Sequence, residues 1–97
     1  MKLEGKKVLV VGAGKSGIAA SELLLDKKIE TVLYDGNKDL DVEKLYEKAP
    51  KLKGMPVLLG ELTDEQLRAF DVAVLSPGVP TDLPVVERMR AQNVCIW

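Results

Sequence analysis

The sequence predicts an α/β fold with three layers, in which a five-stranded parallel sheet in the order 3-2-1-4-5 carries helices on both faces. Unbroken apolar runs suit strands that are covered on both sides, and segments with helical periodicity separate these runs. Right-handed crossovers between the strands then place the helices on the two faces of the sheet. The five runs are residues 8–11, 31–34, 57–59, 72–75 and 94–97.

Length and composition favour one domain over residues 1–97. The chain has 97 residues, of which 46% are hydrophobic. A chain of this size removes roughly 60 to 65% of its unfolded surface from water. It has no histidine, and Cys95 is its single cysteine, which excludes histidine chemistry, an internal disulfide and a thiolate metal cluster. We expect Cys95 to be a core residue.

Charge and hydropathy exclude two classes of partner. The 14 basic and 15 acidic residues give a net charge of −1, so no basic field attracts a nucleic acid. The apolar run at residues 8–11 is too short for a membrane span. We therefore expect a cytoplasmic monomer that binds neither nucleic acid nor membrane.

The first two helices follow from apolar spacing. Residues 14–28 predict an amphipathic helix after the first strand, and residues 41–50 predict a second helix that Pro50 ends. The apolar positions of the first are Ile18, Ala19, Leu23 and Leu24. Those of the second are Val42, Leu45, Tyr46 and Ala49.

Capping signals predict the other two helices. Thr63 and Gln66 have the spacing of a capping box, and Leu62 and Leu67 have that of a hydrophobic staple. A fourth helix is predicted from about residue 82 to about residue 92, with Pro84 in its first turn.

The turn after the first strand has the pattern G-x-G-x-x-G, formed by Gly12, Gly14 and Gly17. Between a strand and a helix this pattern predicts a phosphate site, because the amides of Lys15, Ser16 and Gly17 would be free donors at the positive end of the helix. The alternative is that the glycines only permit a sharp turn. Lys15 is equally consistent with a phosphate contact and with a solvated surface lysine.

The letters "GKS" within this turn resemble the end of an ATP-binding P-loop. That motif requires a glycine where this chain has Leu9, in the middle of the strand. The sequence therefore excludes ATP chemistry at this turn.

Asp35 ends the second strand, at the place where dinucleotide-binding folds hold an acid against a ribose hydroxyl. Such a carboxylate would repel a 2′-phosphate, which disfavours NADP, and it could equally accept a hydrogen bond from the N–H of a uracil ring. Alternatively, Asp35, Gly36 and Asn37 form an ordinary turn.

The loop after the fourth strand reads "SPGVP" and lies across the topological switch point from the glycine turn. Pro77 stiffens this loop and Gly78 allows close backbone approach, although an ordinary turn would use the same residues. Ser76 lacks a histidine partner, so a nucleophilic role is disfavoured. No catalytic residue and no metal site is predicted in the chain.

Taken together, "VLVVGAGKSGIAA", "VLYD" and above all "DVAVLSPGVP" resemble the amino-terminal domain of the cytoplasmic muramoyl ligases, in the branch that adds D-glutamate. The resemblance covers essentially the whole chain. It implies a Rossmann-like domain that binds the uridine diphosphate part of UDP-N-acetylmuramoyl-L-alanine and no nicotinamide cofactor.

By that resemblance, Lys15 and Ser16 would contact the diphosphate, Asp35 and the Gly36 backbone the uracil, and Gly78 the nucleotide. Ser76 and Pro77 belong to the same predicted substrate site. Asn37 stands where relatives often have a basic residue, so a charged contact is not expected there.

The resemblance also implies that catalysis lies outside this chain. ATP, magnesium and D-glutamate would bind a central and a carboxyl-terminal domain, and we expect residues 1–97 to be a non-catalytic part of a three-domain ligase. Two other interpretations stay open at this point. One is an NAD-binding or nucleotide-sensing module, and the other is an interaction domain of the same fold with an empty site.

Overall fold

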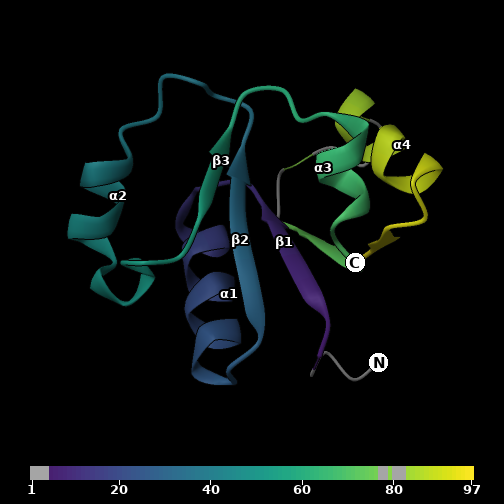
Figure 1. Cartoon of the computed structure of the whole chain (residues 1–97). Helices are drawn as coiled ribbons and strands as arrows, with labels where there is room; N and C mark the ends of the chain where they lie inside the picture. The colour runs from purple at the N-terminus through teal and green to yellow at the C-terminus, as the bar shows by residue number, and fades with distance from the viewer. Residues whose placement is uncertain (1–4, 77–78, 80–82) are drawn as a thin grey trace.

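The computed structural model describes residues 5–76, 79 and 83–97. Its sheet has five parallel strands in the order β3-β2-β1-β4-β5 (Figure 1), which confirms the predicted fold class and strand order. The strands are β1 (Lys7–Val11), β2 (Glu30–Asp35), β3 (Val57–Leu59), β4 (Val72–Leu75) and β5 (Cys95–Ile96).

Helices cover both faces of the sheet, and the core is divided accordingly. One face carries α1 (Lys15–Asp26), α2 (Val42–Lys48) and the 3₁₀ turn η1 (Pro50–Leu52), whereas α3 (Asp64–Arg68) and α4 (Pro84–Ala91) cover the other (Figure 1). The residues of β1 alternate between these two layers. Val8 and Val10 pack in the layer of α1, and Leu9 and Val11 pack in that of α3 and α4.

The central strands end at the same level, which places three loops along one edge of the sheet. Val11 at the end of β1 is in register with Tyr34 on β2 and Leu75 on β4. Asp35 is opposite Leu59 at the end of β3. The loops predicted to form the site therefore follow neighbouring strand ends.

The apolar face of α1 differs from the prediction. Leu24 is buried as expected, but Ala19 and Leu23 are exposed, and the other buried positions are Gly17 and Ser21. The hydroxyl of Ser21 donates to the carbonyl of Gly17 at 2.8 Å, which satisfies it within the helix. At position 17 the helix approaches the residue after β1 too closely for a side chain, whereas Leu24 packs in the core about two turns further on.

The capping signals of the second half hold in the structure. Thr63 and Gln66 form the predicted capping box, with distances of 3.1 and 2.8 Å for its two hydrogen bonds, and Leu62 and Leu67 are buried in one cluster. Helix α4 begins at Pro84 and ends at Ala91, while residue 82, near its predicted start, lies outside the described residues.

Pro50 does not simply end a helix. It follows α2 as expected but opens η1, since proline fits the first position of a helical turn, where no amide donor is needed. Among the described residues, no helix has the length and apolar character needed to cross a membrane.

Candidate functional site

The glycine turn between β1 and α1 depends on two of its glycines for its shape. Gly12 has a φ of +103°, and its amide donates to the carbonyl of Tyr34 at 2.7 Å. A Cβ at position 17 would lie 1.8 Å from the carbonyl oxygen of Gly12. Gly14 differs, because a Cβ there would have nothing within 4 Å. Gly12 and Gly17 therefore build the turn, and Gly14 leaves open space in front of it.

The first turn of α1 presents free backbone donors, as the sequence predicts. Gly14 is the N-cap residue and supplies no side-chain cap, and the first helical hydrogen bond runs from the amide of Ile18 to the carbonyl of Gly14. Within the described part of the chain, the amides of Lys15, Ser16 and Gly17 have no hydrogen-bond acceptor. Lys15 and Ser16 are exposed. Free amides at the start of a 12-residue helix favour an anion.

Asp35 connects the glycine turn to the loop after β2. One carboxylate oxygen accepts from the amide of Ala13 at 2.9 Å, and the other accepts from the amide of Asn37 at 2.8 Å. Each carboxylate oxygen can accept a further hydrogen bond. Gly36, the next residue, is exposed. Asp35 thus fixes two backbone segments and keeps acceptor capacity at the edge of the sheet.

Tyr34 and Gly60 belong to the same edge, and the sequence analysis missed both. The hydroxyl of Tyr34 donates to the carbonyl of Gly60 at 2.5 Å, and the amide of Gly60 donates to the carbonyl of Asp35 at 3.0 Å. Burial raises the pKa of Tyr34, and the carboxylates of Asp35 and Glu61 raise it further. The sequence signal that could have indicated Tyr34 is a tyrosine, with its hydroxyl group, in an apolar strand directly before Asp35.

The loop after β4 reaches the glycine turn through Ser76. Its hydroxyl donates to the carbonyl of Gly12 at 3.3 Å, and its amide donates to the carbonyl of Val11 at 3.1 Å. A Cβ on Gly12 would lie 3.1 Å from the Ser76 hydroxyl and 3.2 Å from a methyl group of Val79. Pro77 and Gly78, which complete the predicted site, lie outside the described residues.

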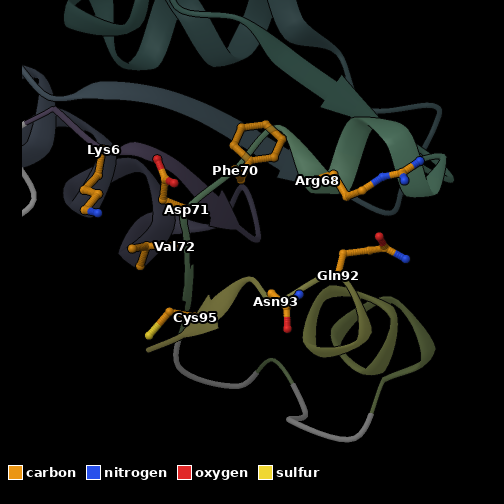
Figure 2. Close-up of a pocket in the computed structure, with 8 residues that line it drawn as sticks. All are labelled: Lys6, Arg68, Phe70, Asp71, Val72, Gln92, Asn93 and Cys95. Atoms are coloured by element: carbon orange, nitrogen blue, oxygen red, sulfur yellow. The ribbon is translucent and has the colours of Figure 1, made fainter.

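The opposite edge of the sheet carries a separate pocket of about 420 Å³ (Figure 2). It opens at the amino ends of β1, β4 and β5, away from the glycine turn. Cys95 lines it and is half-buried, so the expected core position is only partly correct. The lining residues are Lys6, Arg68, Phe70, Asp71, Val72, Gln92, Asn93 and Cys95.

In the described part of the chain, no group of three or more histidine, cysteine, aspartate or glutamate side chains could hold a metal ion. The described residues of the carboxyl edge offer groups suited to binding: the free amides at the start of α1, the Lys15 ammonium, the Ser16 hydroxyl and the fixed carboxylate of Asp35.

Comparison with known proteins identifies the family of this chain. Residues 6–97 match the model of the Mur ligase MurD-like, N-terminal domain. The chain belongs to the MurD-like N-terminal domain family. This confirms the predicted resemblance to the muramoyl ligases.

Two curated relatives of this MurD-like domain are UDP-N-acetylmuramoylalanine--D-glutamate ligases. The protein of Lachnoclostridium phytofermentans is 47% identical over 96 residues, which cover 99% of this chain and 21% of the relative. That of Lachnospira eligens is 39% identical over 97 residues, which cover 100% of this chain and 21% of the relative. The MurD-like domain therefore spans about a fifth of the length of these relatives.

Solved structures resemble the MurD-like domain in fold alone. A pseudomurein peptide ligase type C from Methanothermus fervidus matches with a TM-score of 0.73 at 18% identity, over 95% of this chain and 19% of that one. A minor L-lactate dehydrogenase from Enterococcus mundtii matches with a TM-score of 0.56 at 21% identity, over 92% of this chain and 35% of that one. At these identities only the arrangement of strands and helices is comparable.

Proposed function

We propose that the MurD-like domain binds the uridine diphosphate end of UDP-N-acetylmuramoyl-L-alanine, as part of the ATP-dependent ligase that adds D-glutamate in peptidoglycan precursor synthesis. The observation that carries this proposal is the set of free amides at the start of α1, placed beside the fixed carboxylate of Asp35. The names and identities of the curated relatives support the substrate class.

The diphosphate would bind at the glycine turn. Its oxygens would accept from the amides of Lys15, Ser16 and Gly17, with the Lys15 ammonium and the Ser16 hydroxyl as further donors. The open space at Gly14 would let a phosphate approach the backbone. All of these proposed phosphate contacts would come from the first strand–turn–helix unit.

The uracil would bind where the loops after β2 and β4 meet the glycine turn. Asp35 has acceptor capacity for the N–H of the ring, and Gly36 would offer its backbone. Ser76, Pro77 and Gly78 would border the nucleotide from the loop after β4. Position 37 would supply no charged contact, because asparagine is neutral, and its carboxamide oxygen accepts from the amide of Asp39 at 3.0 Å.

Catalysis would belong to other parts of the ligase. Acyl-phosphate chemistry needs ATP, magnesium and a site for D-glutamate, and we assign these to a central and a carboxyl-terminal domain. Residues 1–97 would then be one substrate-binding, non-catalytic domain of a three-domain, monomeric cytoplasmic enzyme that needs no nucleic acid or membrane partner.

An NAD-binding domain is the second candidate, because Gly12, Gly14, Gly17 and Asp35 have the dinucleotide-binding pattern. The two candidates predict different ligands for the glycine turn, which amide chemical shifts can distinguish. We expect UMP and UDP to shift the amide resonances of residues 12–17 and 35–37 in a ¹⁵N-labelled sample, and NAD to leave them in place. Shifts with NAD and none with UDP would refute the uridine site.

A substitution at position 14 distinguishes a ligand-binding site from a domain of the same fold that binds no ligand. We expect Gly14→Leu to abolish UDP binding, because the side chain would occupy the phosphate space while the fold survives. Ala91→Leu, on an exposed position at the end of α4, is the matched control and should bind as before.

Affinity of the 97-residue chain should be weak, since contacts to the sugar and peptide are assigned to the other domains. A sub-micromolar dissociation constant for UDP would contradict that assignment.

A further inference from the structure

Tyr34 is a buried side chain at the carboxyl edge, and its polar atom reaches a neighbouring loop. Its side chain lies in the core layer of α3 and α4, and the residue is 5% exposed. The hydroxyl nevertheless reaches the end of β3 and donates to the carbonyl of Gly60 at 2.5 Å. A phenylalanine would fill the same apolar space, so the hydrogen bond to Gly60 is what the hydroxyl adds.

The hydrogen bond of Tyr34 extends to Asp35 through Gly60. The amide of Gly60 donates to the carbonyl of Asp35 at 3.0 Å, and the carboxylate of Asp35 accepts from the amide of Ala13 at 2.9 Å. The carbonyl of Tyr34 accepts from the amide of Gly12 at 2.7 Å. Tyr34 therefore touches the glycine turn with its backbone and the end of β3 with its hydroxyl, and Asp35 lies between these contacts.

Gly36 lies near the same hydroxyl. A Cβ built at position 36 would be 3.7 Å from the oxygen of Tyr34. The tip of the tyrosine ring thus borders the space at Gly36, while its hydrogen bond to Gly60 reaches the backbone of Asp35. The Tyr34 hydroxyl is protonated, and so a donor, at neutral pH, and burial with the nearby carboxylates of Asp35 and Glu61 raises its pKa further.

We propose that Tyr34 is a positioning residue for the nucleotide, which holds Asp35 and Gly36 in the geometry that receives the base. This role rests on the proposed function, because it presumes that a uridine nucleotide binds at this edge. Tyr34 itself need not touch the ligand. Its hydroxyl anchors Gly60, and Gly60 anchors the backbone of Asp35.

Tyr46 provides a matched control within the same chain. Its hydroxyl also donates to a backbone carbonyl, that of Met55, at 2.8 Å. Tyr46 belongs to α2 and packs at the edge of the other core layer, so its hydrogen bond has the same chemistry but no connection to Asp35. A general loss of stability should affect both tyrosine variants, whereas a positioning effect should affect only one.

The experiment compares UMP binding by the 97-residue chain and by its Tyr34→Phe and Tyr46→Phe variants. Binding is followed by amide chemical shifts, at a temperature below the thermal unfolding midpoint of each protein. We expect Tyr34→Phe to weaken UMP binding about three- to tenfold, the range for loss of one hydrogen bond, and Tyr46→Phe to change it less than about twofold. Equal UMP affinity of wild type and Tyr34→Phe would overturn the positioning role. Equal weakening by both variants would overturn it too.

A double-mutant cycle with Asp35→Asn tests whether Tyr34 acts through Asp35. We expect Asp35→Asn to weaken UMP binding less in the Tyr34→Phe background than in the wild type, and equally in the Tyr46→Phe background. Additive effects of Tyr34→Phe and Asp35→Asn would refute action through Asp35. No UMP binding by the wild-type chain would instead refute the proposed function, and the role of Tyr34 with it.

Discussion

At position 17 the backbone of α1 lies against the backbone of Gly12, the residue directly after β1, and this contact sets the geometry of the glycine turn. The carbonyl oxygen of Gly12 is 1.8 Å from the place a Cβ would take, and the hydroxyl of Ser76 is 2.9 Å from it. The carbonyl is backbone and cannot rotate away. The helix would therefore have to move outward to accept any other residue.

We expect Gly17→Ala to lower the free energy of unfolding by about 2 to 4 kcal/mol, as overpacking against backbone does. Gly14→Ala is the control and should change it by less than about 1 kcal/mol, because position 14 has open space and an ordinary φ of −78°. Urea unfolding followed by circular dichroism measures both. Equal stability of the two variants would show that the helix can shift without cost.

Tyr34 should also make the fold sensitive to alkaline pH. Its pKa in the folded state is raised above the ordinary value of 10.0, by burial first and then by Asp35 and Glu61, while Arg88 lowers it. The folded state therefore holds this proton more tightly than the unfolded state. The resulting stability is complete below the unfolded pKa and is lost as the pH rises through the folded pKa.

We expect the free energy of unfolding to fall more steeply above about pH 10 in the wild type than in Tyr34→Phe. Urea unfolding at several pH values gives the slopes, and the same slope in both proteins would contradict the expectation.

The short helix α3 shows how an element of five residues is held in place. Its start has the capping box of Thr63 and Gln66, and its buried residue is Leu67. Arg88 of α4 binds it from outside, with hydrogen bonds to the carbonyl of Leu62 at 2.6 Å and to the carboxylate of Asp64 at 2.9 Å. A helix this short is not stable alone, so capping and tertiary contacts must supply its stability.

We expect Thr63→Ala to lower the free energy of unfolding by about 1 kcal/mol, because the amide of Gln66 loses its acceptor. Thr63→Ser keeps a hydroxyl at that position and should retain most of the stability. Thermal and urea unfolding distinguish the two. A serine variant as unstable as the alanine variant would show that the methyl group of Thr63, and not its cap, is what matters.

The elements were predictable where one local rule decided them. The capping box of α3 and the apolar spacing of α2 follow from short stretches of sequence, and both are confirmed. The buried face of α1 was predicted wrongly at Leu23, which is 57% exposed. Hydrophobic spacing alone does not reveal that a glycine brings a helix close to its strand and turns small residues inward.

On the scale of the whole molecule, continuous apolar runs and the handedness of crossovers were enough to predict the sheet order. That order in turn predicted which loops share an edge. The hydrogen bonds between these loops were not predictable. Those from Ala13 to Asp35 and from Tyr34 to Gly60 depend on backbone directions that exist only after the strands have paired. The sequence therefore predicted candidate site residues, but not the hydrogen bonds that hold them in place.

Trp97 gives the domain a built-in optical reporter. It is the single tryptophan, it follows β5, and its backbone exchanges hydrogen bonds with β4, donating to Ala73 at 2.9 Å and accepting from Leu75 at 3.1 Å. The residue is 48% exposed, so its indole is partly in contact with solvent. Its intrinsic fluorescence therefore reports, without any added label, whether the last strand is seated on the sheet.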